Sequence, residues 1–169
     1  YGYIDPDLGG RTARLAATLN GSAGHLDWVA YATYYSVRLT SNFTYFLEDD
    51  VNGDQFQQRD RRVVFGGSLH RRFDTALGDI PVQVTLGGDT RYDRIDKVGL
   101  YHSAAGVRTD AVREDGVDEW SGALFAEAQF ALTPRLRISA GLRGDLFRYD
   151  VRADLAANSG KGWAALAGP

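Results

Sequence analysis

Residues 28–43 read WVAYATYYSVRLTSNF, and apolar or aromatic side chains recur there at every second position. A period of two residues is typical of a β-strand with two unlike faces. The pattern persists for sixteen residues, whereas strands usually span about 5–6 residues and a bilayer-crossing strand needs about 9–11. We expect one face to meet lipid and the other a wet lumen. The expected lipid side holds Val29, Tyr31, Thr33, Tyr35, Val37, Leu39 and Phe43, and the expected lumen side holds Ala30, Ala32, Tyr34, Ser36, Arg38, Thr40 and Asn42.

The composition narrows the possible classes of protein. The chain has 169 residues, of which 44% are hydrophobic, and its net charge is −3. This charge gives no indication of a nucleic-acid partner. No run approaches the ~18 apolar residues of a transmembrane helix, which excludes a helical membrane protein. Because there is no cysteine, disulfides and thiolate metal sites are also excluded.

The same alternation returns in further segments, and it predicts about six long strands. Short connections follow the first, third and fifth strands, whereas long polar loops follow the second, fourth and sixth. The loops cover residues 45–60, 94–119 and 152–161. Outer-membrane barrels have this arrangement, with short periplasmic turns and longer outside loops. The pattern therefore predicts an all-β, antiparallel, up-and-down transmembrane β-barrel segment that forms an open, curved sheet.

The ionised side chains of these strands share the parity that we assign to the lumen, where they stay hydrated and can pair across strands. They are Arg14, Arg38, Asp89, Arg91, Asp93, Glu127, Arg137, Arg143 and Asp145. Phe125 is the one large apolar side chain on the inner side of its strand. If the faces are exchanged, the apolar side becomes the core of a soluble β-sandwich, which explains the parity equally well. The strand lengths and the loop asymmetry favour the barrel.

The two ends of the sequence suggest a piece of a longer protein. The chain has no methionine and opens on Tyr1 without a charged and then apolar leader. It stops at Pro169 without a closing strand. A mature secreted protein whose leader has been removed is the alternative.

Several phrases resemble the barrel of TonB-dependent outer-membrane receptors. The longest is SNFTYFLEDDVNGDQF at residues 41–56, continuing to Arg61 and Arg62. Others are YDRI at 92–95, VGLYH at 98–102, VDE at 117–119, LRGD at 142–145 and FRYDV at 147–151. The opening YGYIDP at residues 1–6 resembles the tail of an outer loop in the same family.

The resemblance implies a 22-stranded barrel in the outer membrane of a Gram-negative bacterium, with a plug domain inside it. It also implies contact with outer-membrane lipid and energy from an inner-membrane complex through TonB. Residues 1–169 would then be a partial β-barrel domain. The plug, the N-terminal segment that contacts TonB and the closing strands would be absent from it.

The resemblance also implies a receptor that takes up a metal chelate, such as a ferric siderophore, with outer loops that help to capture it. Candidate ligand-binding side chains in these loops are Tyr45, Asp49, Asp50, Asn52, Asp54, Tyr101, His102 and Arg108. We expect no catalytic residue, no resident metal and no cofactor, because His25, His70 and His102 lack metal spacing and no nucleophile motif occurs. A structural or adhesive barrel without transport, and a soluble β-sandwich binding module, remain open.

Overall fold

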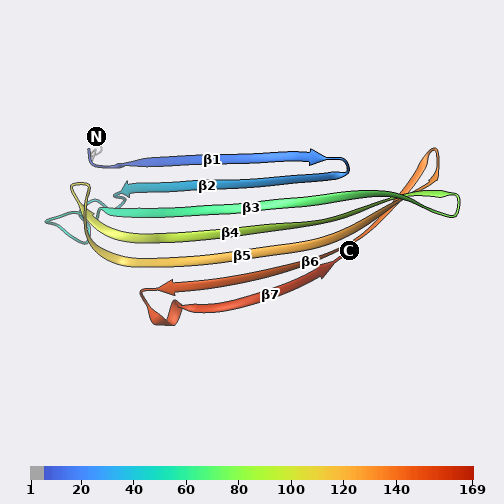
Figure 1. The fold of residues 1–169 in the computed structure, drawn as a ribbon. Helices are drawn as coiled ribbons and strands as arrows, with labels where there is room; N and C mark the ends of the chain where they lie inside the picture. Colours follow the sequence, from blue (N-terminus) through green and yellow to red (C-terminus); the bar gives the residue numbers. More distant parts are fainter. Residues whose placement is uncertain (1–5) are drawn as a thin grey trace.

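A computed structural model describes residues 6–169 as one antiparallel sheet with strand order β1 to β7 (Figure 1). The strands are β1 (Gly9–Ala23), β2 (Leu26–Ser41), β3 (Phe56–Leu77), β4 (Ile80–Ala104), β5 (Val107–Thr133), β6 (Leu136–Ala153) and β7 (Gly160–Gly168). A single 3₁₀ turn, η1 (Ala156–Asn158), precedes β7. The prediction of long antiparallel strands in an open sheet is confirmed, with seven strands instead of about six. The opening stretch at residues 1–5 lies outside the described residues.

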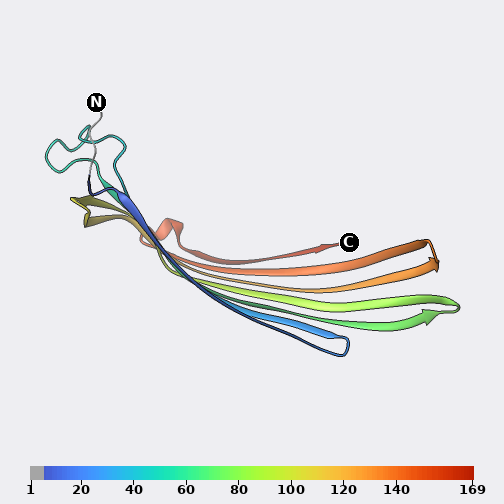
Figure 2. The same ribbon diagram turned by 90° about the horizontal axis from the view of Figure 1, so that it is seen from above.

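The connections fall into two groups at opposite ends of the sheet (Figures 1 and 2). The tight turns β1–β2, β3–β4 and β5–β6 lie at one end, which we call the short-turn end. The β2–β3 loop at residues 42–55, the β4–β5 turn and the segment with η1 lie at the other, which we call the loop end. Figure 2 shows that the sheet curves strongly between these ends.

The prediction of a long loop at residues 94–119 is wrong. The structure extends β4 to Ala104 and starts β5 at Val107, so the connection is the two-residue turn Ala105-Gly106. Both turn residues have positive φ, 48° and 73°, as a type I′ hairpin requires. The alternation of apolar and polar side chains is absent here although the chain is extended. Two strands pair through backbone hydrogen bonds, which do not require any particular side chains. Where both faces of a hairpin are polar, no apolar period marks it.

The sheet register assigns each strand to a face. Across four strands, Leu69, Gly88, Leu124 and Gly144 form one row, and Ser68, Asp89, Ala123 and Asp145 form the next row on the opposite side. We call the side with Leu69 and Leu124 the apolar face, and the side with Asp89 and Asp145 the ionic face. On the apolar face the side chains of Leu124 and Leu142 are 76% and 73% exposed, whereas Asp93 on the ionic face is only 6% exposed.

The predicted faces of β2 are reversed. The register pairs Trp28 with Leu69 and Tyr34 with both Val63 and Leu15, so these side chains lie on the apolar face. Tyr31 and Tyr35 lie on the ionic face with Arg14 and Arg62 as neighbours. Arg38 therefore lies on the apolar side, beside Arg11 and Arg59 near the loop end. Both parity classes of β2 contain aromatic residues, and only the partner strands decide between them.

Tyr31, on the ionic face of β2, fills the space above a glycine of β3. A Cβ added at Gly66, which pairs with Tyr31, would lie 2.3 Å from the Tyr31 ring. The same contact explains Phe125 on the ionic face. It covers Gly87 across the β4–β5 pair, and its ring meets His70 edge-on with the ring centroids 5.3 Å apart. Large rings on this face are thus neighbours of residues without side chains.

A row of aromatic residues crosses the apolar face toward the loop end. Phe65, Tyr92 and Trp120 are successive partners, and Trp163 follows beyond Arg148. The row directly beyond it is charged and holds Arg94, Asp118, Asp150 and Lys161. An aromatic girdle followed by charges is typical of the place where a transmembrane barrel leaves the hydrocarbon layer.

The β-sandwich interpretation is wrong, because residues 6–169 form one sheet and no second sheet covers its apolar face. Among the described residues, no helix is long and apolar enough to cross a membrane.

Candidate functional site

A cavity of about 670 Å³ lies at the loop end, between the β2–β3 loop and the tip of the β4–β5 hairpin. We call it the loop-end cavity. Its lining is rich in carboxylate, amide, hydroxyl and imidazole groups. The polar lining residues are Thr44, Glu48, Asp49, Asn52, Asp54, Gln55, His102, Ser103, Thr109 and Asp110. A cavity of this size falls within the ~300–1,000 Å³ of small-molecule sites.

Asp54 shapes the β2–β3 loop by accepting hydrogen bonds from three consecutive backbone amides. Leu47 N donates at 2.9 Å, Glu48 N at 3.1 Å and Asp49 N at 2.8 Å. These bonds favour the ionised carboxylate and hold the pKa of Asp54 below its usual value of 3.8, with the amide of Asp49 contributing most. The carboxylate therefore acts first as an internal anchor for the loop.

Asp49 plays a similar part at the turn near Gly53. Its carboxylate accepts from Asn52 N at 2.8 Å and Val51 N at 2.9 Å, and from Asn52 Nδ2 at 3.0 Å. The bond from Asn52 N is the largest cause that lowers the pKa of Asp49. Gly53 N closes the turn onto Asp49 O, and Gly53 has the positive φ, 79°, that the turn requires.

Gln55 joins the loop to the hairpin. It is 4% exposed, and its Oε1 accepts from Ser103 Oγ at 3.0 Å and from Gly106 N at 2.8 Å. Ser103 N also donates to Gln55 O at 2.8 Å. Two segments that lie far apart in the sequence are thereby held as the two walls of one cavity.

Tyr101 packs within the β4–β5 hairpin and outside the cavity lining. It offers no surface to a ligand, because it is fully buried. The Arg108 guanidinium lies 4.5 Å from its ring centroid, and the Tyr101 hydroxyl donates to Glu114. Burial raises the pKa of Tyr101, with the bond to Glu114 acting in the same direction. Lys97 Nζ bonds Glu114 at 2.7 Å and lowers the pKa of that carboxyl.

The candidate ligand residues thus fall into distinct groups. Asp49, Asn52, Asp54 and His102 line the cavity together, and His102 Nδ1 lies 3.0 Å from Asp110 Oδ2. Asp50 is exposed outside the lining, and Tyr45 accepts from Asp54 N at 2.6 Å through its carbonyl oxygen. Tyr101 and Arg108 stack on each other below. Sequence reasoning missed Thr44, Glu48, Gln55 and Asp110, because no local pattern predicts which residues of two distant segments will meet.

On the ionic face, the register gathers the predicted lumen residues with the exception of Arg38. Arg91 bonds Asp93 at 2.7 Å, and Arg143 bridges Asp89 and Asp145, both at 2.9 Å. Arg14, Glu127 and Arg137 lie on the same face without an ion pair among the described residues. No group of three or more metal-ligating side chains occurs within residues 6–169.

Long up-and-down strands, an apolar face with an aromatic girdle and an ionic opposite face define the class of transmembrane β-barrels. Residues 1–166 match the family described as TonB dependent receptor-like, beta-barrel, so the chain belongs to this family. The family is one of transporters that work with TonB at the Gram-negative outer membrane. Among curated proteins, no match to the chain was found.

Proposed function

We propose that this chain belongs to a receptor that takes up a metal chelate, such as a ferric siderophore, through the outer membrane. The loop-end cavity is the observation that carries this proposal, because a polar site of about 670 Å³ at the rim of a barrel suits capture of a small polar ligand. The hydroxyl, amide and imidazole groups in its wall can hydrogen-bond the oxygen atoms of a chelate, and the carboxylates of Glu48, Asp49, Asp54 and Asp110 favour one without net negative charge. The loop end would face the outside and the short-turn end the periplasm.

We propose further that the ionic face lines the lumen, where the Arg91–Asp93 pair and the Arg143 bridge stay hydrated or meet a plug. The outer edges of β1 and β7 lack a partner strand among the described residues. Because unpaired backbone groups in lipid cost several kcal/mol each, other strands of a larger barrel would cover both edges. Contact with TonB would lie outside the described barrel strands.

The test is ligand binding and uptake by the receptor in its native outer membrane. A panel of radiolabelled ferric chelates is offered to cells with an active and with an inactivated TonB system. The proposal expects at least one chelate to bind in both and to enter only when TonB is active. Replacement of His102 and Asp110 by alanine should weaken its binding. If no chelate binds, or uptake does not depend on TonB, the proposal is wrong.

A further inference from the structure

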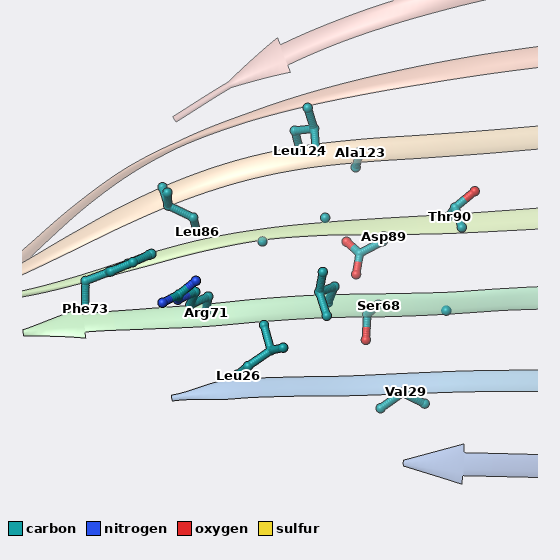
Figure 3. Close-up of a pocket in the computed structure, with 14 residues that line it drawn as sticks. Leu26, Val29, Ser68, Arg71, Phe73, Leu86, Asp89, Thr90, Ala123 and Leu124 are labelled. Carbon is teal, nitrogen blue, oxygen red and sulfur yellow. The ribbon is translucent and has the colours of Figure 1, made fainter. Parts of the chain in front are cut away.

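A groove of about 750 Å³ crosses the apolar face near the short-turn end (Figure 3). On this face it is walled mostly by the apolar side chains of Leu26, Leu69, Phe73, Leu86 and Leu124, together with Arg71 and Thr90. Gly67 and Gly88 form the floor of the groove between the leucines, because they have no side chain. Figure 3 shows Leu26, Leu86 and Leu124 on three different strands around this space. We call it the leucine groove.

Arg71 is an unusual residue for this position. Its register partners are Leu26 and Leu86, so it lies on the apolar face. It has no carboxylate partner among residues 6–169, and its guanidinium lies 4.9 Å from the centroid of the Phe73 ring. An arginine on the lipid side of a barrel is destabilising toward the bilayer centre and much less so at the interface. An arginine on this face is therefore best accommodated at the membrane surface, where its charge can pair with an anion.

The place of Arg71 along the strand agrees with this requirement. Leu26, its partner, is the first residue of β2, so Arg71 lies level with the Gly24-His25 turn. A second, polar hollow of about 600 Å³ opens there and shares Leu26, Arg71 and Phe73 with the leucine groove. His25, Arg72 and Asp74 also line it, and Asp74 accepts a hydrogen bond from Gln83 at 3.2 Å. An apolar channel thus continues into a polar hollow beside the β1–β2 turn, and Arg71 lines both.

We propose that these two hollows form a binding site for one phospholipid of the membrane. An acyl chain lies in the leucine groove, and the phosphate accepts hydrogen bonds from Arg71, with His25 close by. The planar guanidinium matches two phosphate oxygens at once. Arg72 takes no direct part, because its side chain lies on the ionic face and bonds Asp27 at 3.0 Å. This inference rests on the proposal that the apolar face meets lipid, and it does not depend on the cargo.

The experiment uses the whole receptor, purified from membranes in a mild detergent and measured by native mass spectrometry. The probes are phosphatidylglycerol and the matching diacylglycerol, which lacks the phosphate. We expect the natural receptor to hold one phosphatidylglycerol and to bind diacylglycerol far more weakly. Arg71→Gln should weaken phosphatidylglycerol binding about tenfold or more, as for loss of a charged hydrogen bond. Arg71→Lys should retain part of it, and the control Arg72→Gln should bind normally.

Equal binding by the natural receptor and Arg71→Gln would overturn the site, as would equal binding of the two probes. Detection of receptor dimers in place of receptor–lipid complexes would show that a second copy of the protein covers the groove. That result would also overturn the lipid site. A heat-induced shift in gel mobility confirms that each variant is folded. A folded receptor that transports its chelate without holding lipid refutes this inference alone, whereas a lipid-holding receptor without transport refutes only the proposed function.

Discussion

Three consecutive amides converge on Asp54, and no other acceptor replaces it in the β2–β3 loop. We expect Asp54→Ala to leave the strands intact but to loosen residues 47–49. Amide hydrogen exchange at these residues should then accelerate at least tenfold, since each loses its hydrogen-bond acceptor. Asp50→Ala is the matched control, because Asp50 is exposed and anchors no amide among those described. Equal exchange in both variants would contradict this role of Asp54.

The same carboxylate sets the pH dependence of the loop. The folded loop lowers the pKa of Asp54 from 3.8, so its contribution to stability is complete above pH 3.8. That contribution declines as pH falls through the folded pKa. Protection of the amides of residues 47–49, corrected for intrinsic exchange, should stay constant from about pH 7 to 4.5 and fall below about pH 3.8. A loss of protection between pH 7 and 5 would contradict the assignment of this pH dependence to Asp54.

Gly66 tests the packing of rings on the ionic face. A Cβ there would lie 2.3 Å from the Tyr31 ring, so Gly66→Ala must displace the ring. We expect the free energy of unfolding of Gly66→Ala to fall by about 1–3 kcal/mol, the usual cost of overpacking. Gly144→Ala, where a Cβ meets nothing within 4 Å, should be neutral or slightly stabilising. Urea titration of the folded receptor, followed by gel mobility, distinguishes the two.

At the scale of elements, Gln55 is the joint between the β2–β3 loop and the β4–β5 hairpin. Gln55→Ala removes the acceptor for Ser103 Oγ and Gly106 N and leaves a buried amide unpaired. We expect the two cavity walls to separate and affinity for the chelate to fall about tenfold, as for a lost buried bond of roughly 1–3 kcal/mol. Gln58→Ala, at an exposed position near the start of β3, should bind normally. Unchanged affinity of the Gln55 variant would show that the cavity does not bind the ligand.

The elements also show how far the sequence is informative. Alternation predicts residues 61–73, 120–132 and 136–146 of β3, β5 and β6 with their faces, because one side of each stretch is mostly apolar. It fails for β2, where Tyr34 and Tyr35 are adjacent and either parity looks suitable for lipid. It fails again for residues 94–119, where the hairpin is polar on both sides.

The candidate site was predictable only in part. Loop composition placed Asp49, Asp54 and His102 at one end of the sheet. Only three-dimensional contacts, such as those of Gln55 with Ser103 and Gly106, show that these residues enclose one cavity. Likewise, only the structure shows that Tyr101 is fully buried and is not part of the cavity wall.

At the scale of the whole molecule, we propose that the two faces of the sheet divide the protein between two solvents, lipid and water. The bare leucines on one side suit acyl chains, and the paired ions on the other suit water. The girdle through Phe65, Tyr92 and Trp120 lies at the loop end of the apolar band, and the band continues past the level of Arg71 to the row of Phe73, Val84 and Ala128. The division into two solvents accounts for the strand length, the single layer and the scarcity of buried apolar side chains.

Residues 1–169 contain no cysteine, so, once any cysteine elsewhere in the receptor is replaced, single cysteines along β5 can carry a spin label in the receptor reconstituted into bilayers. The decisive measurement is collision of each label with oxygen, which concentrates in lipid, and with a nickel chelate, which stays in water. Oxygen collisions should peak at positions 124, 126 and 128, and nickel collisions at 121, 123 and 129, in strict alternation. Equal nickel access at both sets, or the reverse alternation, would contradict an apolar face in lipid and an ionic face in the lumen.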